Sequence, residues 1–298
     1  MSRILVVTGA ASGLGLEFAR LGAERGDTLV LADIDADALA AVADEFSARG
    51  VAVLWARCDV AQEAEVEALA GLCEARFGAP HWVFNNAGVG SGGLLWEHSA
   101  ADWRWVWGVN VMGVVHGIQS FVPRMLRRAA REPDYRGVVM NTASMAGLLN
   151  APLMGIYNAS KHAVVSLTET LEQDLRLVTS QVRAAVLCPY FVPTGIAHSE
   201  RHRPRDLARG EVRTLSQQVA QLQSERAVSS GKVSARQVAE RVFAGLAAGD
   251  FYLYSHPDGL SAVEARFRDI QSGLPPGDVF ASRPEVGAWL RAQLRRPP

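Results

Sequence analysis

The sequence predicts an α/β fold: a doubly wound, predominantly parallel sheet of seven strands with helices on both faces. Short apolar runs alternate with longer segments of helical periodicity from residue 3 to about residue 254. This alternation is typical of a parallel sheet that is covered on both sides. Because no linker rich in Pro, Gly and Ser interrupts it, we expect one domain over residues 1–298.

We interpret each apolar run as a buried strand. In chain order the runs are Ile4–Val7, Leu29–Ala32, Val51–Trp55, Trp82–Phe84, Val138–Met140, Ala184–Leu187 and Phe251–Tyr254. Between the third and fourth runs, Val66, Leu69 and Leu72 are spaced to share one helical face. The intervening segments are therefore predicted to be helices that pack on the sheet.

Two segments depart from this alternation. Residues 195–231, which we call the lid segment, are polar and helical in composition, and we expect them to cover a substrate site. Their arginine-rich run, 201–213, is interleaved with acidic residues and is interpreted as a solvated face; the alternative is that it receives an anionic group of the substrate. Residues 257–298, the C-terminal arm, contain an amphipathic stretch and a Pro-rich tail that we expect to fray.

Composition excludes several classes of protein. Thirty basic and 31 acidic residues leave a net charge of −1, which gives no overall field to hold nucleic acid or an anionic bilayer. No apolar stretch approaches the ~18 residues that span a membrane, so we expect a cytoplasmic protein. Cys58, Cys73 and Cys188 form no CxxC pair and are interpreted as reduced core residues. His198 and His202 lack a third ligand, so no metal site is expected.

A glycine-rich turn follows the first run. Such a turn lets the backbone approach a pyrophosphate at a helix N-terminus and is typical of Rossmann-like dinucleotide sites, although glycine also closes ordinary turns. Its spacing is GxxxGxG. The residues expected to contact the cofactor here are Thr8, Gly9, Ser12, Gly13, Leu14 and Gly15.

Asp33 ends the second run, 18 residues past Gly15. An acidic residue at about 20 residues' offset binds the adenosine ribose hydroxyls, and its charge repels a 2′-phosphate. Since Ile34 supplies no cation, NAD is favoured over NADP. The alternative for Asp33 is a helix N-cap, a role that Asp35 or Asp37 fills equally well.

Two more fragments follow the ends of strands, where ligands bind in open α/β sheets. Asp59 and Val60 follow the third run, and the carboxylate of Asp59 is suited to accept a hydrogen bond from an adenine amine. Asn85, Asn86, Ala87 and Gly88 follow the fourth. We expect Asn86, Ala87 and Gly88 to contact the cofactor; ordinary turn chemistry is the alternative for the Asn pair.

Ser144 follows the fifth run, and Tyr157 and Lys161 are spaced to share one helical face. A free Tyr has a pKa near ~10, too high for a base at neutral pH. A nearby ammonium together with oxidised nicotinamide favours the phenolate. The alternative is an ordinary surface Tyr/Lys pair.

Together, Thr8-Gly9-x-x-x-Gly13-x-Gly15, Asn85–Gly88, Asn110, Ser144 and Tyr157-x-x-x-Lys161 resemble the classical short-chain dehydrogenase/reductase family, over about residues 3–195. The resemblance implies that Tyr157 is the acid/base and that Lys161 lowers its pKa and binds the nicotinamide ribose. It implies that Ser144 hydrogen-bonds the substrate oxygen and that Asn110 holds a water in a proton relay.

The same resemblance implies cofactor contacts after the sixth run, at Pro189 and at Thr194, which matches the position that contacts the nicotinamide carboxamide. The family usually has Pro-Gly where this chain has Pro189-Tyr190. Losing a glycine restricts the backbone, so we expect a differently shaped loop with Tyr190 pointing into the substrate cleft.

The predicted function is that of an NAD-dependent oxidoreductase interconverting a secondary alcohol and a ketone. Short stretches at 121–125 and 252–257 resemble the branch that oxidises bulky benzylic alcohols, which favours a hydrophobic or aromatic substrate. A sugar, steroid or acyl-carrier substrate, or a non-catalytic NAD(P) sensor or scaffold, are the alternatives. Helices near 102–125 and 157–178 are apolar around much of their circumference, and relatives usually pair through them. We therefore expect a homodimer or homotetramer.

Overall fold

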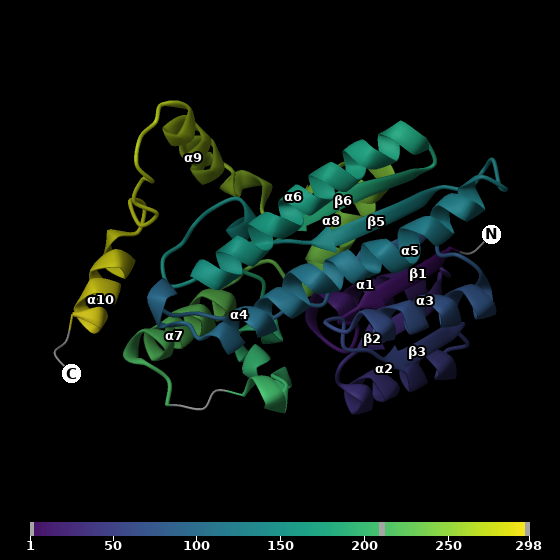
Figure 1. Ribbon diagram of the computed structural model, residues 1–298, viewed down its shortest axis with the longest axis horizontal. Helices are drawn as coiled ribbons and strands as arrows, with labels where there is room; N and C mark the ends of the chain where they lie inside the picture. Colours follow the sequence, from purple (N-terminus) through teal and green to yellow (C-terminus); the bar gives the residue numbers. More distant parts are fainter. Residues whose placement is uncertain (1–2, 209–211, 296–298) are drawn as a thin grey trace.

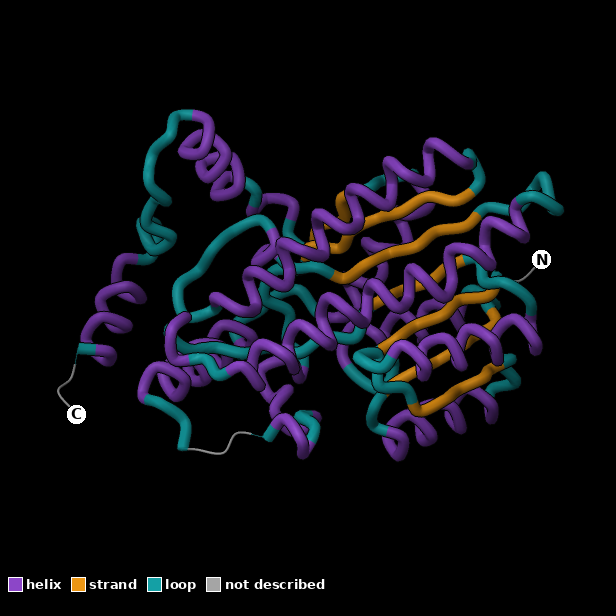
Figure 2. The backbone as a smooth tube through the Cα atoms, viewed as in Figure 1, coloured by secondary structure: helices purple, strands orange, loops and turns teal. Residues whose placement is uncertain are grey.

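The structure, a computed structural model, describes residues 3–208 and 212–295. Its core is one sheet of seven strands that are all parallel, in the order β3-β2-β1-β4-β5-β6-β7 (Figures 1 and 2). The strands are β1 (Ile4–Thr8), β2 (Thr28–Asp33), β3 (Val53–Arg57), β4 (Trp82–Asn85), β5 (Gly137–Thr142), β6 (Val182–Cys188) and β7 (Tyr252–Tyr254). The predicted fold class is confirmed.

The prediction that all seven strands are buried is wrong for the two at the edges. In β3 no residue is fully buried, and in β7 only the central one is. Trp55 and Tyr252 are both more than one-third exposed. An edge strand has a neighbour on one side only, so its side chains lie at the margin of the helical layers. The apolar composition of these strands did not distinguish them from central ones.

Helices cover both faces of the sheet (Figure 1). One core contains buried residues of α1 (Gly13–Glu24), α2 (Ala36–Ala48) and α8 (Ala235–Ala248). The core on the other face contains residues of α3 (Glu63–Phe77), α5 (Gly113–Ala129) and α6 (Gly155–Val178). The sheet is therefore doubly wound, and all strands have their carboxyl ends at one edge.

The inward face of α3 differs from the predicted one. Val66 and Leu69 are buried as expected, but Leu72 is half exposed and Cys73 is buried in its place. Relative to Val66, Cys73 is seven residues on and completes the helical stripe, whereas Leu72 falls outside it. Cys58, Cys73 and Cys188 are all buried and free, which confirms their interpretation as reduced core residues.

The lid segment contains two short 3₁₀ helices, Gly195–His202 and Arg205–Leu207, and α7 (Leu215–Ser229). The C-terminal arm contains α9 (Ser261–Gln271) and α10 (Pro284–Leu294), which extend from the sheet so that α10 lies beside α7 (Figure 1). Leu290 of α10 packs against Ala220 of α7. Residues 296–298 of the tail expected to fray, and 209–211 of the arginine-rich run, lie outside the described residues.

The interpretation of the arginine-rich run as a solvated face is wrong for Arg203. Its side chain is 4% exposed, and its Nη1 donates to Asp102 Oδ1 at 2.7 Å. Asp102 belongs to α4 (Ala100–Trp107), and the guanidinium also lies over the ring of Trp105, 5.0 Å from its centre. A buried cation needs such a partner, and Arg203 therefore anchors the lid segment to α4.

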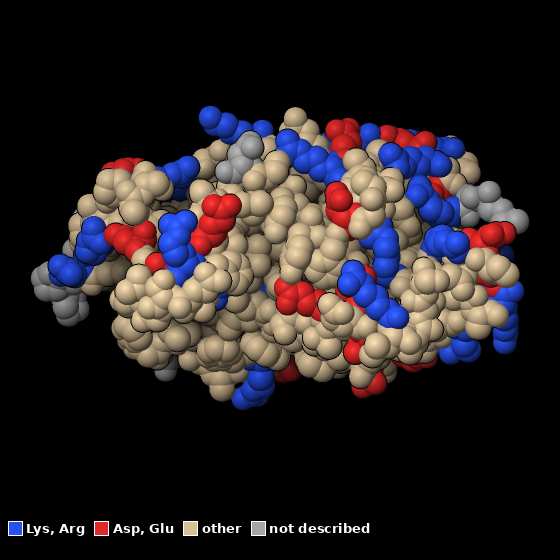
Figure 3. All heavy atoms as spheres, turned by 90° about the horizontal axis from the view of Figure 1, so that it is seen from above, with Lys and Arg blue, Asp and Glu red and all other residues tan. Residues whose placement is uncertain are grey.

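None of the described helices has the length and apolar character that crossing a bilayer requires. Basic and acidic side chains are interspersed over the face of the molecule seen in Figure 3, as the net charge of −1 leads one to expect.

Candidate functional site

A cleft of about 1200 Å³ lies along the carboxyl edge of the sheet. It is lined by the glycine-rich turn, by the loops that follow the strands, by the lid segment and by the C-terminal arm. Most of the predicted site residues line it; Thr8, Gly15 and Asn110 are not among the lining residues. The position agrees with the rule that ligands bind beyond the carboxyl ends of parallel strands.

The glycine-rich turn is built so that the backbone itself faces the cleft. Gly9 and Gly13 have φ values of 68° and 56°, which favour glycine. A Cβ on Gly15 would lie 2.0 Å from the carbonyl oxygen of Gly9, so no larger residue fits there. The turn leads directly into α1, whose N-terminus offers unpaired N–H groups. These features fit a dinucleotide with its pyrophosphate at this helix end.

Asp33 lines the cleft at the end of β2 and braces the turn. Its Oδ2 accepts from the backbone N–H of Ala11 at 2.9 Å, and its Oδ1 accepts from the N–H of Asp35 at 3.0 Å. The N-cap of α2 is Asp35, which accepts from the N–H of Ala38. The alternative role for Asp33 as that N-cap is therefore excluded.

Asp59 and Val60 also line the cleft, after β3. Asp59 Oδ1 accepts from the N–H of Ala61 at 3.0 Å, which fixes the turn. Val60 is buried against Gly113 of α5, where an added Cβ would lie 2.8 Å from Val60 Cγ2. The small residue in α5 thus lets this loop approach the start of α5 closely.

Thr8 and Asn86 tie the ends of β1 and β4 together. Thr8 Oγ1 accepts from the N–H groups of Asn86 and Ala87 at 2.9 and 3.1 Å, and Asn86 Nδ2 donates to the carbonyl of Thr8 at 3.0 Å. Asn86, Ala87 and Gly88 line the cleft. The side chain of Asn86 thus binds across the sheet to β1 and does not cap its own turn, which the turn-chemistry alternative would require, while the backbone beside it faces the cleft.

Ser144, Tyr157 and Lys161 come together beyond β5. Ser144 Oγ donates to the carbonyl of Pro189 at 3.3 Å, and Lys161 Nζ donates to the carbonyl of Thr142 at 2.8 Å. Burial raises the pKa of Tyr157, and a hydrogen bond with Ser144 acts in the opposite direction. The two hydroxyl groups are therefore within direct reach of each other.

Lys161 is buried, and burial lowers its pKa to about 8. Its Nζ lies 5.8 Å from the ring centre of Tyr157. A Cβ on Gly88 would lie 3.4 Å from both Lys161 Nζ and Asn110 Oδ1. The structure thus brings together all four residues for which catalytic roles are predicted, and Gly88 provides the room between two of them.

Asn110 lies in a π-helical turn, Gly108–Met112, between α4 and α5. It is fully buried; its Oδ1 accepts from the N–H of Val89, and its Nδ2 donates to Val89 O and Ser160 Oγ. The π-turn and the contacts of Asn110 with Val89 and Ser160 were not predicted from the sequence. Ser160 precedes Lys161 on α6, and this position next to a predicted catalytic residue could have suggested that Ser160 lies at the site.

Tyr190 lines the cleft, as predicted. Leu153 is the only described non-glycine residue with a positive φ, so the residue at 190 does not need glycine's freedom. The ring of Tyr190 lies 4.5 Å from Phe191 and 5.8 Å from His256, centre to centre. Thr194 lies against the glycine turn, with its Cγ2 3.4 Å from where a Cβ on Gly13 would be.

The two stretches that favoured an aromatic substrate do not reach the cleft. Phe121 and Met125 are buried in the core beneath α5, and neither they nor Tyr254 and His256 are among the lining residues. The apolar side chains that do line the cleft come from elsewhere: Met145, Leu149, Leu153, Met154, Val192, Ile196 and Ala220.

Comparison with known proteins agrees with this geometry. Residues 3–205 match the sequence profile described as short chain dehydrogenase. A "CLA biosynthesis dehydrogenase/reductase" of Lactiplantibacillus plantarum is 32% identical, over 92% of this chain and 95% of its own. A 1-deoxy-11-beta-hydroxypentalenate dehydrogenase of Streptomyces exfoliatus is 34% identical, over 97% and 94%.

Solved structures give the same result. A short chain dehydrogenase/reductase from Burkholderia phymatum, in complex with NAD, is 51% identical with a TM-score of 0.90, over 93% of this chain and 97% of that one. A short-chain dehydrogenase structure from Novosphingobium aromaticivorans is 29% identical with a TM-score of 0.72, over 98% of each chain. The chain therefore belongs to the short-chain dehydrogenase/reductase family, whose members are oxidoreductases that act on CH–OH groups with NAD or NADP.

Proposed function

We propose that the protein is an NAD-dependent dehydrogenase, one catalytic domain that interconverts a hydrophobic secondary alcohol and its ketone. The observation that carries the proposal is the meeting of Ser144, Tyr157 and Lys161 in the same cleft as the glycine-rich turn. NAD, when bound, supplies the hydride acceptor at C4 of its nicotinamide. The protein binds and orients the substrate and takes up the proton.

Each side chain has a distinct role in this proposal. The phenolic oxygen of Tyr157 takes the hydroxyl proton of the alcohol, and Ser144 Oγ, which contacts the same phenol, orients the substrate oxygen. Lys161 holds the nicotinamide ribose and stabilises the phenolate. Asn110 fixes the loop at Val89 through two hydrogen bonds and, by the family resemblance, holds a relay water.

Burial by itself works against proton removal from Tyr157, because it raises the phenol's pKa. A positive charge in the same low-dielectric site lowers that pKa, and the ammonium of Lys161 is held near the ring by the carbonyl of Thr142. We therefore expect alcohol oxidation to rise with pH through an apparent pKa below ~10, the value of a free Tyr.

A sensor or scaffold on the same fold has no chemical need for a buried Tyr–Lys pair, so we favour the enzyme. The decisive variant is Tyr157→Phe, which keeps the ring and removes the proton acceptor. Turnover should fall by at least ~10²-fold while NAD binding, measured by titration calorimetry, is mostly retained. Near-normal turnover of a verified alcohol by Tyr157→Phe would contradict the mechanism. It would also remove the main reason for preferring an enzyme over a non-catalytic sensor.

The preference for NAD rests on Asp33, because a carboxylate beside the ribose repels a 2′-phosphate. The Burkholderia phymatum relative is described with NAD, which supports the same choice. We expect the unaltered protein to bind NAD far more tightly than NADP, and the double variant Asp33→Ala, Ile34→Arg to shift binding and activity towards NADP.

The control for this experiment must allow for the bracing role of Asp33. Asp33→Asn removes the charge and keeps one acceptor oxygen for the N–H of Ala11, at the loss of the bond from the N–H of Asp35, so it disturbs the loop less than Asp33→Ala does. We expect the dissociation constants of this variant for NAD and NADP to differ less than those of the unaltered protein, and we expect the variant to fold. Equal dissociation constants for NAD and NADP in the unaltered protein would show that the ribose assignment is wrong.

A further inference from the structure

The outer part of the cleft has an apolar wall that the protein does not cover. Ile270, Leu274 and Val279 of the C-terminal arm line the cleft, yet they are 56%, 58% and 46% exposed. Burying apolar area is favourable by ~25 cal/mol per Å², so an apolar ligand that lies on these side chains gains binding energy. The wall belongs to the arm, whereas Ser144 follows β5 and Tyr157 lies on α6, and all of these residues line the same cleft.

The two sides of this outer part are α7 and α10. Ala220 of α7 and Leu290 of α10 pack against Leu153, which follows β5 and also lines the cleft. An apolar surface therefore runs from the loop beside the catalytic residues, between the two helices, to the arm.

Arg226 brings a positive charge into this apolar part. Its guanidinium lies 5.0 Å from the ring centre of Trp289, and both residues line the cleft. The stacking holds the planar group in place while its N–H donors stay available at the edge, an arrangement suited to bidentate contact with a carboxylate.

Other charged groups line the outer cleft as well. The carboxylates of Asp269 and Asp278 accept hydrogen bonds from the N–H groups of Gly277 and Phe280, and so shape the loop of the arm. Arg266, Arg283 and Glu285 complete the charged lining of this part of the arm. Among the described arginines that themselves line the cleft, Arg226 is the one whose guanidinium lies over a cleft-lining ring of another helix.

We propose that the substrate is an amphipathic alcohol: a long apolar body that lies on the C-terminal arm and a carboxylate, remote from the hydroxyl, that binds Arg226. The inference rests on the proposed function and names its substrate class. It assigns the arm, α10 included, a role in binding the substrate, and it assigns Arg226 a role in specificity.

The test compares a hydroxystearic acid that has its hydroxyl near mid-chain with its methyl ester. The acid should be oxidised with a kcat/KM at least tenfold higher, mainly through KM, because the ester lacks the charge. Arg226→Gln should remove most of this preference, and Arg226→Lys, which keeps the charge, should restore part of it. Arg268→Gln is the matched control, since Arg268 lies on α9 but does not line this cleft.

A binding measurement separates this inference from the proposed function. Laurate, which cannot be oxidised at a hydroxyl, should bind the NADH-loaded protein more tightly than methyl laurate, and Arg226→Gln should abolish the difference. Equal kcat/KM for acid and ester, or equal loss in Arg226→Gln and Arg268→Gln, would overturn the inference while leaving a dehydrogenase. Arg226-dependent laurate binding without turnover of any alcohol would support the anion site and overturn the proposed function.

Discussion

At the scale of single residues, Lys161 shows how function opposes stability. Its ammonium is buried with the carbonyl of Thr142 as its hydrogen-bond acceptor, and burial lowers its pKa from 10.5 to about 8. Between pH 8 and 10.5 the unfolded chain therefore binds more protons than the folded protein, and this group makes stability rise with pH. Below pH 8 the folded state carries the full cost of the buried charge.

We therefore expect Lys161→Met to abolish turnover yet stabilise the fold at pH 7. Removing the buried charge should raise the free energy of unfolding by up to about 3 kcal/mol. Losing the hydrogen bond to Thr142 should lower it by about 1 kcal/mol. Urea unfolding should show a net gain of about 2 kcal/mol at pH 7 that shrinks towards pH 10. The matched control is Lys232→Met, since Lys232 is the protein's other lysine and is exposed. A variant less stable than the parent at pH 7 would contradict the argument.

The sequence predicted where these residues lie better than it predicted the contacts around them. The spacing of Tyr157 and Lys161 indicates a shared helical face, and the structure has both on α6. That Asn86 and Asp33 also brace the backbone did not follow from spacing, because their partners, Thr8 and Ala11, lie 78 and 22 residues away in the chain. Contacts across the sheet depend on strand order, which local patterns leave open.

At the scale of elements, the helical run from α4 through α5 illustrates the same limit. The apolar spacing around Trp103, Trp107 and Val111 indicates a helix, and the structure has one, but with a π-turn at Gly108–Met112. Such turns often occur at functional sites, and this one carries Asn110. A π-turn contains one residue more than an α-helical turn. This changes the apolar periodicity too little for the π-turn to be predicted from the sequence.

The lid segment is anchored by Arg203, which belongs to a run that the sequence led us to interpret as a solvated face. Arg203 and Asp102 form a buried pair, with side chains 4% and 3% exposed, and Asp102 also closes the capping box of α4 with Ser99. The interleaved charges of the segment resemble a solvated face. Only the tertiary structure shows that one of them crosses to α4.

We expect Arg203→Met to destabilise the protein by about 3 kcal/mol, because it leaves the buried carboxylate of Asp102 without its guanidinium partner. The double variant Arg203→Met, Asp102→Asn removes both charges and should recover part of the loss. Urea unfolding of the two single variants and the double variant gives the coupling energy. Additive losses would show that the pair does not hold the lid segment to α4.

At the scale of the whole molecule, the doubly wound architecture was predictable, because strand–helix alternation permits few topologies. The packing of the C-terminal arm was not. Its amphipathic stretch predicts a helix, but Phe267 and Ile270 of α9 are about half exposed, and α10 packs on α7 instead of on the sheet. Periodicity identifies the apolar face of a helix but does not predict which other element that face packs against.

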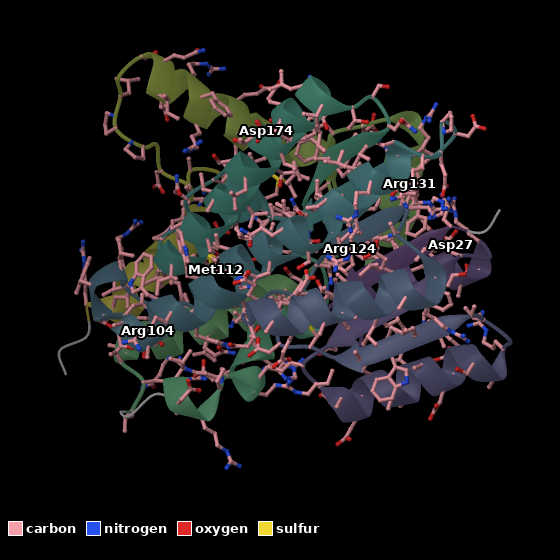
Figure 4. All side chains as sticks on the ribbon, turned by 45° about the vertical axis from the view of Figure 1, so that its right-hand side comes forward. Asp27, Arg104, Met112, Arg124, Arg131 and Asp174 are labelled. Carbon is pink, nitrogen blue, oxygen red and sulfur yellow. The ribbon has the colours of Figure 1, made fainter. Side chains whose placement is uncertain are left out.

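The same difficulty bears on assembly. Phe121 and Met125, part of the apolar surface of α5 that suggested subunit contacts, are buried within this chain. Arg124, labelled in Figure 4, lies beside them and pairs with Glu67 and Glu74 of α3. The burial of α5 is thus largely explained without a second subunit.

Exposed apolar residues nevertheless remain on both helical segments. Trp107 and Met112 are each 37% exposed on the α4–α5 run, and Leu177 and Val178 are 84% and 68% exposed at the end of α6. Surface of this kind is stabilised when a two-fold axis brings it against a copy of itself.

We therefore expect a dimer or tetramer with two-fold symmetry, measured by sedimentation velocity at micromolar concentration. Met112→Glu and Leu177→Glu test the two surfaces separately, because a charge placed in a buried self-contact is repeated across the two-fold axis. Asp44→Lys, at an exposed position of α2 on the opposite face of the sheet, is a charge-changing control. A protein that sediments as a monomer before any substitution would show that these residues are exposed without a subunit partner.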